Sequence, residues 1–189
     1  MKSVDLTNVQ ESGDGLRLPA GGYICKYTNV EDRPDKEYLY MEYDIVEGEF
    51  KDYYKDLSAR ADFWGGRVYR SYKPAALPMF KRMCTAVSKS NGNFVFDGGA
   101  INNNEKTLIG KYVGLVFGEE EYIGNDGNKK TRLYVFAEKS VQDIRDGNYK
   151  VPKLKLLKED TPANTSAPAS GLEGFMNIPD DAGDEFPFN

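Results

Sequence analysis

Hydrophobic and polar residues alternate along the first part of the chain with the period of two that is typical of β-strands. Residues 23–30 follow a pair of glycines, are rich in β-forming side chains and predict a first strand. Residues 31–36 contain turn-forming residues, and residues 37–47 resume the alternation. One face of this second run carries Leu39, Met41, Tyr43 and Ile45, and the other carries Tyr38, Tyr40, Glu42 and Asp44. The pattern therefore predicts a β-hairpin with one apolar face and one polar face that bears tyrosines.

Three further strands are expected from weaker or later alternation. Gly48 permits a bend, after which residues 50–57 predict a third strand. Residues 111–122 and 131–141 alternate on either side of a turn rich in glycine and asparagine. They predict the fourth and fifth strands as a second hairpin.

A helical period interrupts the strands between residues 74 and 92. Apolar side chains recur there every three or four positions, at Leu77, Phe80, Cys84 and Val87. Pro78 suits a first helical turn and Gly92 a C-terminal cap, so we expect one amphipathic helix. The order of three strands, a helix and two strands is that of the OB-fold, a five-stranded β-barrel with its helix between strands three and four. We therefore expect a mainly β fold of this type, with an open α+β sheet or another small barrel as the alternatives.

Charge divides the chain into two parts. The net charge is -5, yet all 25 Lys and Arg residues lie at or before Lys158, and seven of the 30 acids follow it. Residues 161–174 consist largely of Pro, Ala, Ser, Thr and Gly, a composition that cannot build a core. We therefore expect a folded body at residues 1–158, with 25 cations against 23 acids, and a disordered acidic tail at residues 159–189.

The end of the tail combines acidic and aromatic residues. A purely solvating tail does not need phenylalanines, so the rings read as anchors and the acids as groups that steer toward a basic surface. The expected partner-binding residues are Asp180, Asp181, Asp184, Glu185, Phe186, Pro187 and Phe188.

Residues 51–90 interleave cations with aromatic rings. Nine Lys and Arg residues stand against three aspartates there, with seven aromatic side chains among them. Cations neutralise phosphates, and flat rings stack on unpaired bases for roughly 1 to 3 kcal/mol each without reading their identity. Trp64, beside two glycines, is expected on a loop that reaches over a groove. The candidate DNA-binding residues are Tyr40, Tyr53, Tyr54, Lys55, Arg60, Phe63, Trp64, Arg67, Tyr69, Arg70, Tyr72 and Lys73.

Several classes of chemistry lack the residues that they need. The chain has no histidine, which excludes Ser-His-Asp and Cys-His catalysis and imidazole metal sites. Cys25 and Cys84 are too few for a four-thiolate zinc site, and their apolar surroundings are typical of reduced, buried thiols. No apolar run approaches the roughly 18 residues of a membrane helix, and the N-terminus lacks a signal-peptide core. We therefore expect a soluble, non-enzymatic protein that needs no metal or cofactor and does not contact membranes.

Two alternatives to nucleic-acid binding are open. Pro34 and Asp35, followed by Glu49 and Lys51, match the loose Pro-Asp and Glu-x-Lys signature of Mg²⁺-dependent nucleases. Asp35 is expected in the hairpin turn, away from the second pair, and such short matches arise readily by chance. The other alternative is a protein-interaction adaptor or DNA mimic, in which the acidic tail is the active surface and the body binds no DNA.

At its tip the sequence resembles the C-terminal acidic peptide of bacterial single-stranded-DNA-binding proteins. Asp184-Glu185-Phe186-Pro187-Phe188 matches the acids, hydrophobic residue, proline and phenylalanine of that peptide, and the chain departs from it by the additional Asn189. The body, from residues 18–23 (LPAGGY) through residues 143–147 (DIRDG), looks like proteins of bacteriophage replication modules. The resemblance implies a phage-encoded single-stranded-DNA-binding protein in the host cytoplasm that acts in DNA replication or recombination. It further implies recruitment of replication or recombination proteins through the tail and allows a homo-oligomer.

Overall fold

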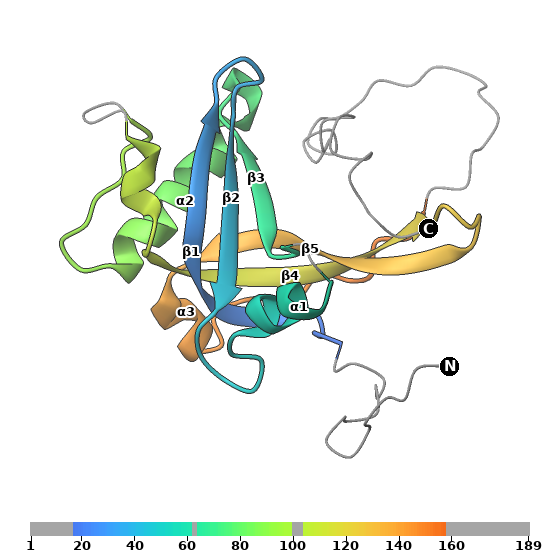
Figure 1. Cartoon of the computed structure of the whole chain (residues 1–189). Coiled ribbons are helices and arrows are strands. Elements are labelled where there is room, and N and C mark those ends of the chain that lie inside the picture. Colours follow the sequence, from blue (N-terminus) through green and yellow to red (C-terminus); the bar gives the residue numbers. More distant parts are fainter. Residues whose placement is uncertain (1–16, 62–63, 100–103, 158–189) are drawn as a thin grey trace, which may run out of the picture.

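The computed structural model describes residues 17–61, 64–99 and 104–157 of the chain (Figure 1). Five strands form one antiparallel sheet in the order β3-β2-β1-β4-β5. The strands are β1 (Gly21–Arg33), β2 (Tyr38–Ile45), β3 (Arg67–Ser71), β4 (Tyr112–Ile123) and β5 (Lys129–Lys139). The helices are α1 (Tyr53–Ala61), α2 (Leu77–Ser90) and α3 (Val141–Arg145), with short 3₁₀ helices η1 (Pro74–Ala76) and η2 (Glu105–Leu108). The fold is therefore mainly β, as the sequence predicts, and no helix in the described ranges has the length and apolar character to cross a membrane.

β1 connects the two halves of the sheet. Its residues 21–26 pair with β4, and its residues 25–33 pair with β2. A register shift between Tyr27 and Asn29 marks a β-bulge just beyond the last pair with β4, and a bulge increases the local twist of a strand. In Figure 1, β1, β2 and β3 stand upright, while the β4–β5 hairpin crosses beneath them.

The two edge strands of the sheet, β3 and β5, are joined by side chains. Arg70 on β3 donates a hydrogen bond from Nε to Oε1 of Glu138 on β5, and Glu138 is fully buried. Within the described part of the chain, no ladder of backbone hydrogen bonds pairs β3 with β5. The sheet therefore curls without closing, so the mainly β class and the five strands are confirmed but the closed barrel is not.

The core lies between the inner face of the sheet and α2. The predicted apolar face of β2 is confirmed, because all four of its members are buried: Leu39, Met41, Tyr43 and Ile45. The predicted helix is confirmed as α2, which has Pro78 in its first turn and is followed by Gly92 with a left-handed φ of 60°. It buries Phe80, Met83, Cys84, Ala86 and Val87. Leu77, expected on the same face, is 48% exposed and stays outside the core.

The predicted third strand over residues 50–57 is wrong, because this part of the chain leads into α1. Asp44, at the end of β2, places its carboxylate at the start of this helix. It accepts hydrogen bonds from the backbone N–H groups of Tyr54 (3.0 Å) and Lys55 (3.2 Å), which a helix leaves without partners in its first turn. Asp44 is therefore buried at the start of α1, although the alternation of β2 predicts it on the polar face. The third strand is instead β3, which follows α1.

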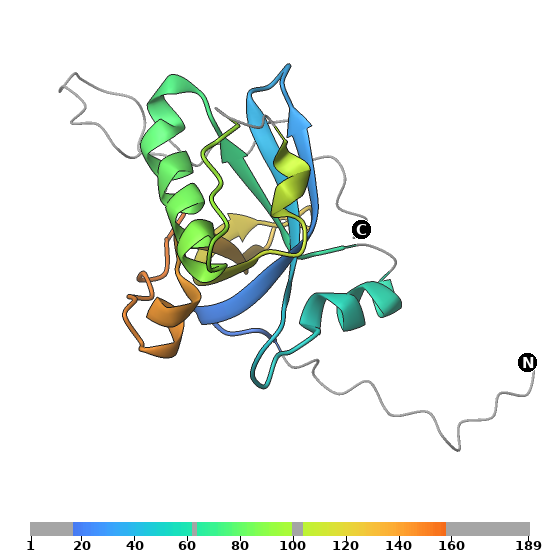
Figure 2. The same ribbon diagram turned by 90° about the vertical axis from the view of Figure 1, so that its left-hand side faces the viewer.

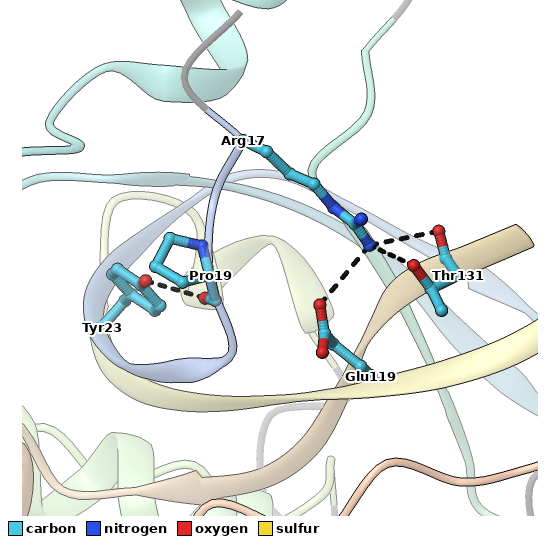
Figure 3. A network of polar contacts seen from close by, with 5 residues as sticks. All are labelled: Arg17, Pro19, Tyr23, Glu119 and Thr131. Carbon is cyan, nitrogen blue, oxygen red and sulfur yellow. Dashed lines mark hydrogen bonds and ion pairs between the residues drawn. The ribbon is translucent and has the colours of Figure 1, made fainter. Parts of the chain in front are cut away.

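The chain that precedes β1 is fastened to the β4–β5 hairpin. Arg17 donates from Nη2 to Oγ1 (2.7 Å) and to the carbonyl oxygen (3.2 Å) of Thr131, and it forms an ion pair with Glu119 at 3.4 Å (Figure 3). The Tyr23 hydroxyl donates to the carbonyl oxygen of Pro19 at 2.8 Å. Burial raises the pKa of Tyr23 to about 12. These contacts fix the position at which β1 begins.

Candidate nucleic-acid interface

The polar face of β1, β2 and β3 presents three cross-strand rows of side chains. Residues that are paired in an antiparallel sheet point to the same side of it. The rows, from β1 through β2 to β3, are Arg33–Tyr38–Ser71, Glu31–Tyr40–Tyr69 and Asn29–Glu42–Arg67. Arg33 is exposed, and the other members are half-buried. Tyrosines therefore occupy the middle of this face, with one arginine in each outer row.

Tyr38, Tyr40 and Tyr69 form a cluster, which we call the tyrosine platform. The ring of Tyr69 lies 5.5 Å from the ring of Tyr38 and 5.4 Å from the ring of Tyr40, measured between centroids, at interplanar angles of 76° and 53°. Tilted and edge-on contacts of this kind are favourable for aromatic pairs and hold the rings in place. Because each side chain is only half-buried, part of each remains open to a ligand.

Each arginine beside the platform has an acidic neighbour. Arg33 Nη2 lies 2.6 Å from Oε2 of Glu31. Arg67 stands directly opposite Glu42 in the register of β2 and β3. The surroundings of the platform are therefore close to neutral, so stacking on the rings contributes more to any nucleic-acid affinity here than contacts with phosphates.

Tyr40 presents an uncharged ring. Burial raises its pKa above the ordinary value, and the hydrogen bond that its hydroxyl donates to Glu42 Oε1 at 2.7 Å adds to the effect. The phenol therefore keeps its proton at neutral pH. Tyr40 consequently adds no repulsion toward phosphate groups.

The two predicted tyrosines of α1 pack in or against the core. Tyr54 is 7% exposed and packs edge-on against Tyr43, with ring centroids 5.4 Å apart. Tyr53 is half-buried and packs edge-on against Tyr54 at 5.1 Å. The structure therefore places Tyr54 in the interior, which corrects its expected role in contacting DNA, and leaves Tyr53 partly exposed on α1.

Trp64 is likewise directed into the body of the protein. Its indole N–H donates to the carbonyl oxygens of Tyr43 (3.2 Å) and Gly66 (3.0 Å), and its ring packs against the core. Gly66 is buried beside it, and a Cβ on this residue would lie 2.3 Å from the carbonyl oxygen of Tyr43. The close approach of these two backbones requires glycine. The expectation that Trp64 reaches over a groove is thereby corrected.

Alternation along β3 separates the predicted residues Arg67, Tyr69 and Arg70. Residues 67, 69 and 71 are half-buried on the outer face, whereas residues 68 and 70 are buried. Arg70 is therefore engaged in a buried ion pair with Glu138, and its charge is not available to contact DNA. Arg67 and Tyr69 join Tyr40 on the same face, and these are the predicted residues that the structure brings together.

The remaining predicted cations and Tyr72 lie on other parts of the surface. Lys55 is exposed on α1 and Lys73 is exposed after β3. Tyr72 donates from its hydroxyl to Asp32 Oδ1 at 2.8 Å and packs edge-on against Phe80 of α2 at 6.0 Å. Because α1 and α2 lie on different sides of the sheet (Figures 1 and 2), the basic stretch of the sequence does not form one patch.

Several expected contact residues lie outside the described part of the chain. Phe63 and the side chain of Arg60 are among them. So are the expected partner-binding residues Asp180, Asp181, Asp184, Glu185, Phe186, Pro187 and Phe188.

Tyr38 and Arg33 lie on the same face as Tyr40 and Tyr69, although they are not among the residues predicted to contact DNA. The signal for Tyr38 was present, because the alternation of β2 places it on the same face as Tyr40. Arg33 precedes a proline and reads as part of the turn, whereas β1 extends to this residue. Strand ends of this kind are set by pairing with β2, which local composition does not reveal.

The residues of the nuclease signature lie at opposite ends of β2. Asp35 is in the turn between β1 and β2, and Glu49 and Lys51 follow the far end of β2 (Figure 1). The eight residues of β2 span about 25 Å at ~3.4 Å per residue. Carboxylates that share one Mg²⁺ lie within a few ångströms of each other, so this pattern does not assemble a metal site. Within the described ranges, no group of three or more His, Cys, Asp or Glu residues could hold a metal ion.

Both cysteines are free and buried, as the sequence predicts. Burial raises the pKa of the Cys84 thiol to about 11 and raises that of Cys25 well above its usual range. Neither thiol is therefore activated as a nucleophile at neutral pH.

The chain matches no protein-family model, and a comparison with curated proteins found no match either.

Proposed function

We propose that the protein binds single-stranded DNA, without sequence preference and without catalysis, on the outer face of β1, β2 and β3. The observation that carries the proposal is the tyrosine platform. Three half-buried rings lie side by side on a rigid sheet, with Arg33 and Arg67 in the flanking rows. Every base has a flat face that can stack on such rings, so this surface suits many sequences equally.

The platform favours unpaired bases over duplex DNA. In a duplex the faces of the bases are stacked on one another, and only base edges and phosphates are accessible to a protein. Edge recognition needs donors and acceptors on an element that enters a groove, whereas the platform offers rings on a broad sheet. Duplex binding would rest on phosphate contacts alone, and the paired acids Glu31 and Glu42 weaken those contacts.

The body is proposed as an OB-type barrel that is open between β3 and β5. The Arg70–Glu138 ion pair brings these edge strands together in place of a hydrogen-bonded ladder. OB-folds are partly open barrels that bind oligonucleotides on the face of strands two and three. The tyrosine platform lies on that face, since Tyr38 and Tyr40 are on β2 and Tyr69 is on β3.

The biological setting is proposed from two resemblances, that of the tip to bacterial single-stranded-DNA-binding proteins and that of the body to proteins of bacteriophage replication modules. The protein would protect and organise single strands during phage DNA replication or recombination in the host cytoplasm. Its acidic tip, with Phe186 and Phe188, would recruit replication or recombination proteins.

The proposal is tested by fluorescence anisotropy with labelled oligo-dT, a duplex and an RNA of equal length. We expect oligo-dT to bind more tightly than the duplex. Tyr38→Ala, Tyr40→Ala and Tyr69→Ala should each weaken oligo-dT binding by about 1 to 3 kcal/mol, or roughly 5-fold to 150-fold. The matched control is Tyr112→Ala, because Tyr112 is 43% exposed on β4 and pairs with Lys26, away from the platform.

Two results would contradict the proposal. Failure of the wild-type protein to bind any of the three nucleic acids would favour the adaptor or DNA-mimic alternative. Equal losses for Tyr112→Ala and for the platform variants would show that the platform is not the binding surface.

A further inference from the structure

A second candidate surface lies on the α2 side of the molecule, away from the tyrosine platform. There α2, η2 and the chain at residues 95–99 enclose an open groove of about 870 Å³. Figure 2 shows this side of the molecule, with α2 and η2 in view. Its apolar lining comes from Leu39, Leu77, Phe80, Cys84, Val95 and Phe96. We call it the α2 groove.

The apolar lining of the α2 groove is partly uncovered. Val95 is 71% exposed and Leu77 is 48% exposed, although both line a concave surface. Exposed apolar side chains that line a cavity of this size are typical of a binding groove.

The charged side chains on the α2 wall of the groove are all cations, so we call it the cationic wall. The sequence of α2 contains Lys81, Arg82 and Lys89 and no acid, and all three cations are exposed. Lys81 and Lys89 line the groove directly. A ligand with apolar anchors and negative charge on one side would therefore match the lining and this wall.

The other side of the groove carries acids that are partly engaged within the protein. Asp97 Oδ1 accepts from the backbone N–H of Gly99 at 3.0 Å, and Asp32 Oδ1 accepts from Tyr72 at 2.8 Å. Glu105 lies at the start of η2. An acidic ligand would consequently place its carboxylates along α2 and keep them away from these residues.

A segment of this chain has the chemistry that the groove requires. Residues 180–188 contain four acids and two phenylalanines around a proline, and no cation. The phenylalanines are bulky apolar anchors, and the acids precede them on one side of the segment. The same segment lies outside the described residues.

The connection to this segment is long enough to reach the groove. The described chain ends at Leu157, and 29 residues run from position 158 to Phe186. A flexible chain of this length has an end-to-end distance of about 30 Å. A compact body of roughly 140 residues has a radius of gyration of about 14 Å, so every face of the body is within reach of the tip.

We propose that the C-terminal tip of the chain, residues 180–188, docks in its own α2 groove, with Phe186 and Phe188 on the apolar lining and the acids along Lys81 and Lys89. Tethering places the tip near the groove at a concentration of mM order, so weak intrinsic affinity suffices. A docked tip is hidden from other proteins until a partner with higher affinity removes it. This inference does not depend on DNA binding by the platform.

Cys84 provides a natural reporter, because it lines the α2 groove and Cys25 does not. The experiment measures the alkylation rate of each cysteine by iodoacetamide, using mass spectrometry on the full-length protein. If the Kd of the tip is about one third of its effective concentration, the tip occupies the groove about three quarters of the time. Alkylation of Cys84 is then about fourfold slower than in a protein whose groove is empty. We therefore expect Phe186→Ala combined with Phe188→Ala to raise the alkylation rate of Cys84 about fourfold and to leave the rate of Cys25 unchanged.

Charge variants test the cationic wall. Lys81→Glu combined with Lys89→Glu should accelerate Cys84 to the same extent, because both cations contact the docked acids. The matched control is Lys55→Glu on α1, which removes an exposed lysine from another side of the sheet and should leave the rate unchanged. A synthetic peptide of residues 177–189 should restore slow alkylation of the Phe186→Ala and Phe188→Ala protein.

Three outcomes would overturn the proposal. The first is an equal Cys84 rate in the wild-type protein and the phenylalanine variant. The second is a parallel rise at Cys25, which would indicate general loosening of the fold. The third is a peptide that displaces oligo-dT but leaves the Cys84 rate unchanged, which would place the tip on the tyrosine platform.

Discussion

Separating Arg70 from Glu138 should strongly destabilise the fold, because this ion pair joins the two edges of the sheet. Glu138 is fully buried, and the Arg70 side chain is 10% exposed. The only other cation near Glu138 in the described structure is Arg82, whose Nε lies 4.0 Å from Oε2. Removal of one partner from a buried ion pair leaves an uncompensated charge and costs about 3 to 5 kcal/mol. We expect losses of this size for Arg70→Met and for Glu138→Leu.

The double variant Arg70→Met and Glu138→Leu should recover most of the lost stability. It leaves no unpaired charge and fills the site with apolar groups of similar size, a change that is often neutral or stabilising. The double-mutant cycle should therefore give a coupling energy of at least about 2 kcal/mol.

Urea unfolding measures these differences, with fluorescence of Trp64, the single tryptophan of the chain, as the probe. At an m-value of about 2 kcal/mol per M, the single variants should unfold at urea concentrations lower by about 1.5 to 2.5 M. If a single variant fails to fold, recovery in the double variant still reports the coupling. Additive losses, with a coupling below about 0.5 kcal/mol, would refute the role of the pair in joining β3 to β5.

Three further outcomes are expected. Gly66→Ala should lower the free energy of unfolding by about 1 to 3 kcal/mol, because its Cβ would lie 2.3 Å from the carbonyl oxygen of Tyr43. The control is Gly21→Ala, whose Cβ meets only the Tyr23 ring at 3.5 Å, and it should change the melting temperature little. Burial raises the pKa values of Tyr23 and Tyr72 to about 12, from the usual 10. The unfolded chain therefore releases these protons first, so their contribution to stability is complete below pH 10 and should be lost as the pH rises toward 12, which urea titrations at several pH values would reveal. The logarithm of oligo-dT affinity should fall only weakly with the logarithm of salt concentration. Two phosphates fully neutralised by Arg33 and Arg67 would give a slope of about -1.4, at roughly -0.7 each, and the neighbouring Glu31 and Glu42 should keep the slope no steeper than this. A slope steeper than about -4 would indicate a larger basic surface than the platform provides.

The elements that the sequence predicts correctly are those defined by local periodicity. These are the hairpin of β1 and β2, helix α2, and the hairpin of β4 and β5, although β4 buries residues 113–118 in one continuous run. Such patterns are readable because a residue and its neighbours on the same face are close in sequence.

The elements that the sequence does not reveal depend on distant partners. Helix α1 starts under the carboxylate of Asp44, ten positions before Tyr54. β3 is five residues long and buries an arginine, Arg70, whose partner Glu138 lies 68 positions away. From the sequence alone an arginine is expected at the surface, because arginines are rarely buried without a charged partner.

In the candidate site, too, local patterns identify single residues, whereas contacts between distant residues determine which of them lie together. Tyr40 is selected from the alternation of β2, and Arg67 and Tyr69 are selected from composition. Their meeting on one face follows from the pairing of β2 with β3, which no local pattern contains. Trp64 and Tyr54 both contact Tyr43, which is distant from them in sequence, and these contacts direct their side chains toward the core.

Photochemical crosslinking locates the DNA-binding surface most directly. The full-length protein would be irradiated with an oligo-dT in which single thymines are replaced by 5-iodouracil, and the crosslinked peptides would be identified by mass spectrometry. Crosslinks should fall on Tyr38, Tyr40 and Tyr69 and not on Tyr112, because stacked bases lie against the rings of the platform. Crosslinks confined to α1, to Trp64 or to α2, with none on the platform, would contradict the proposed function.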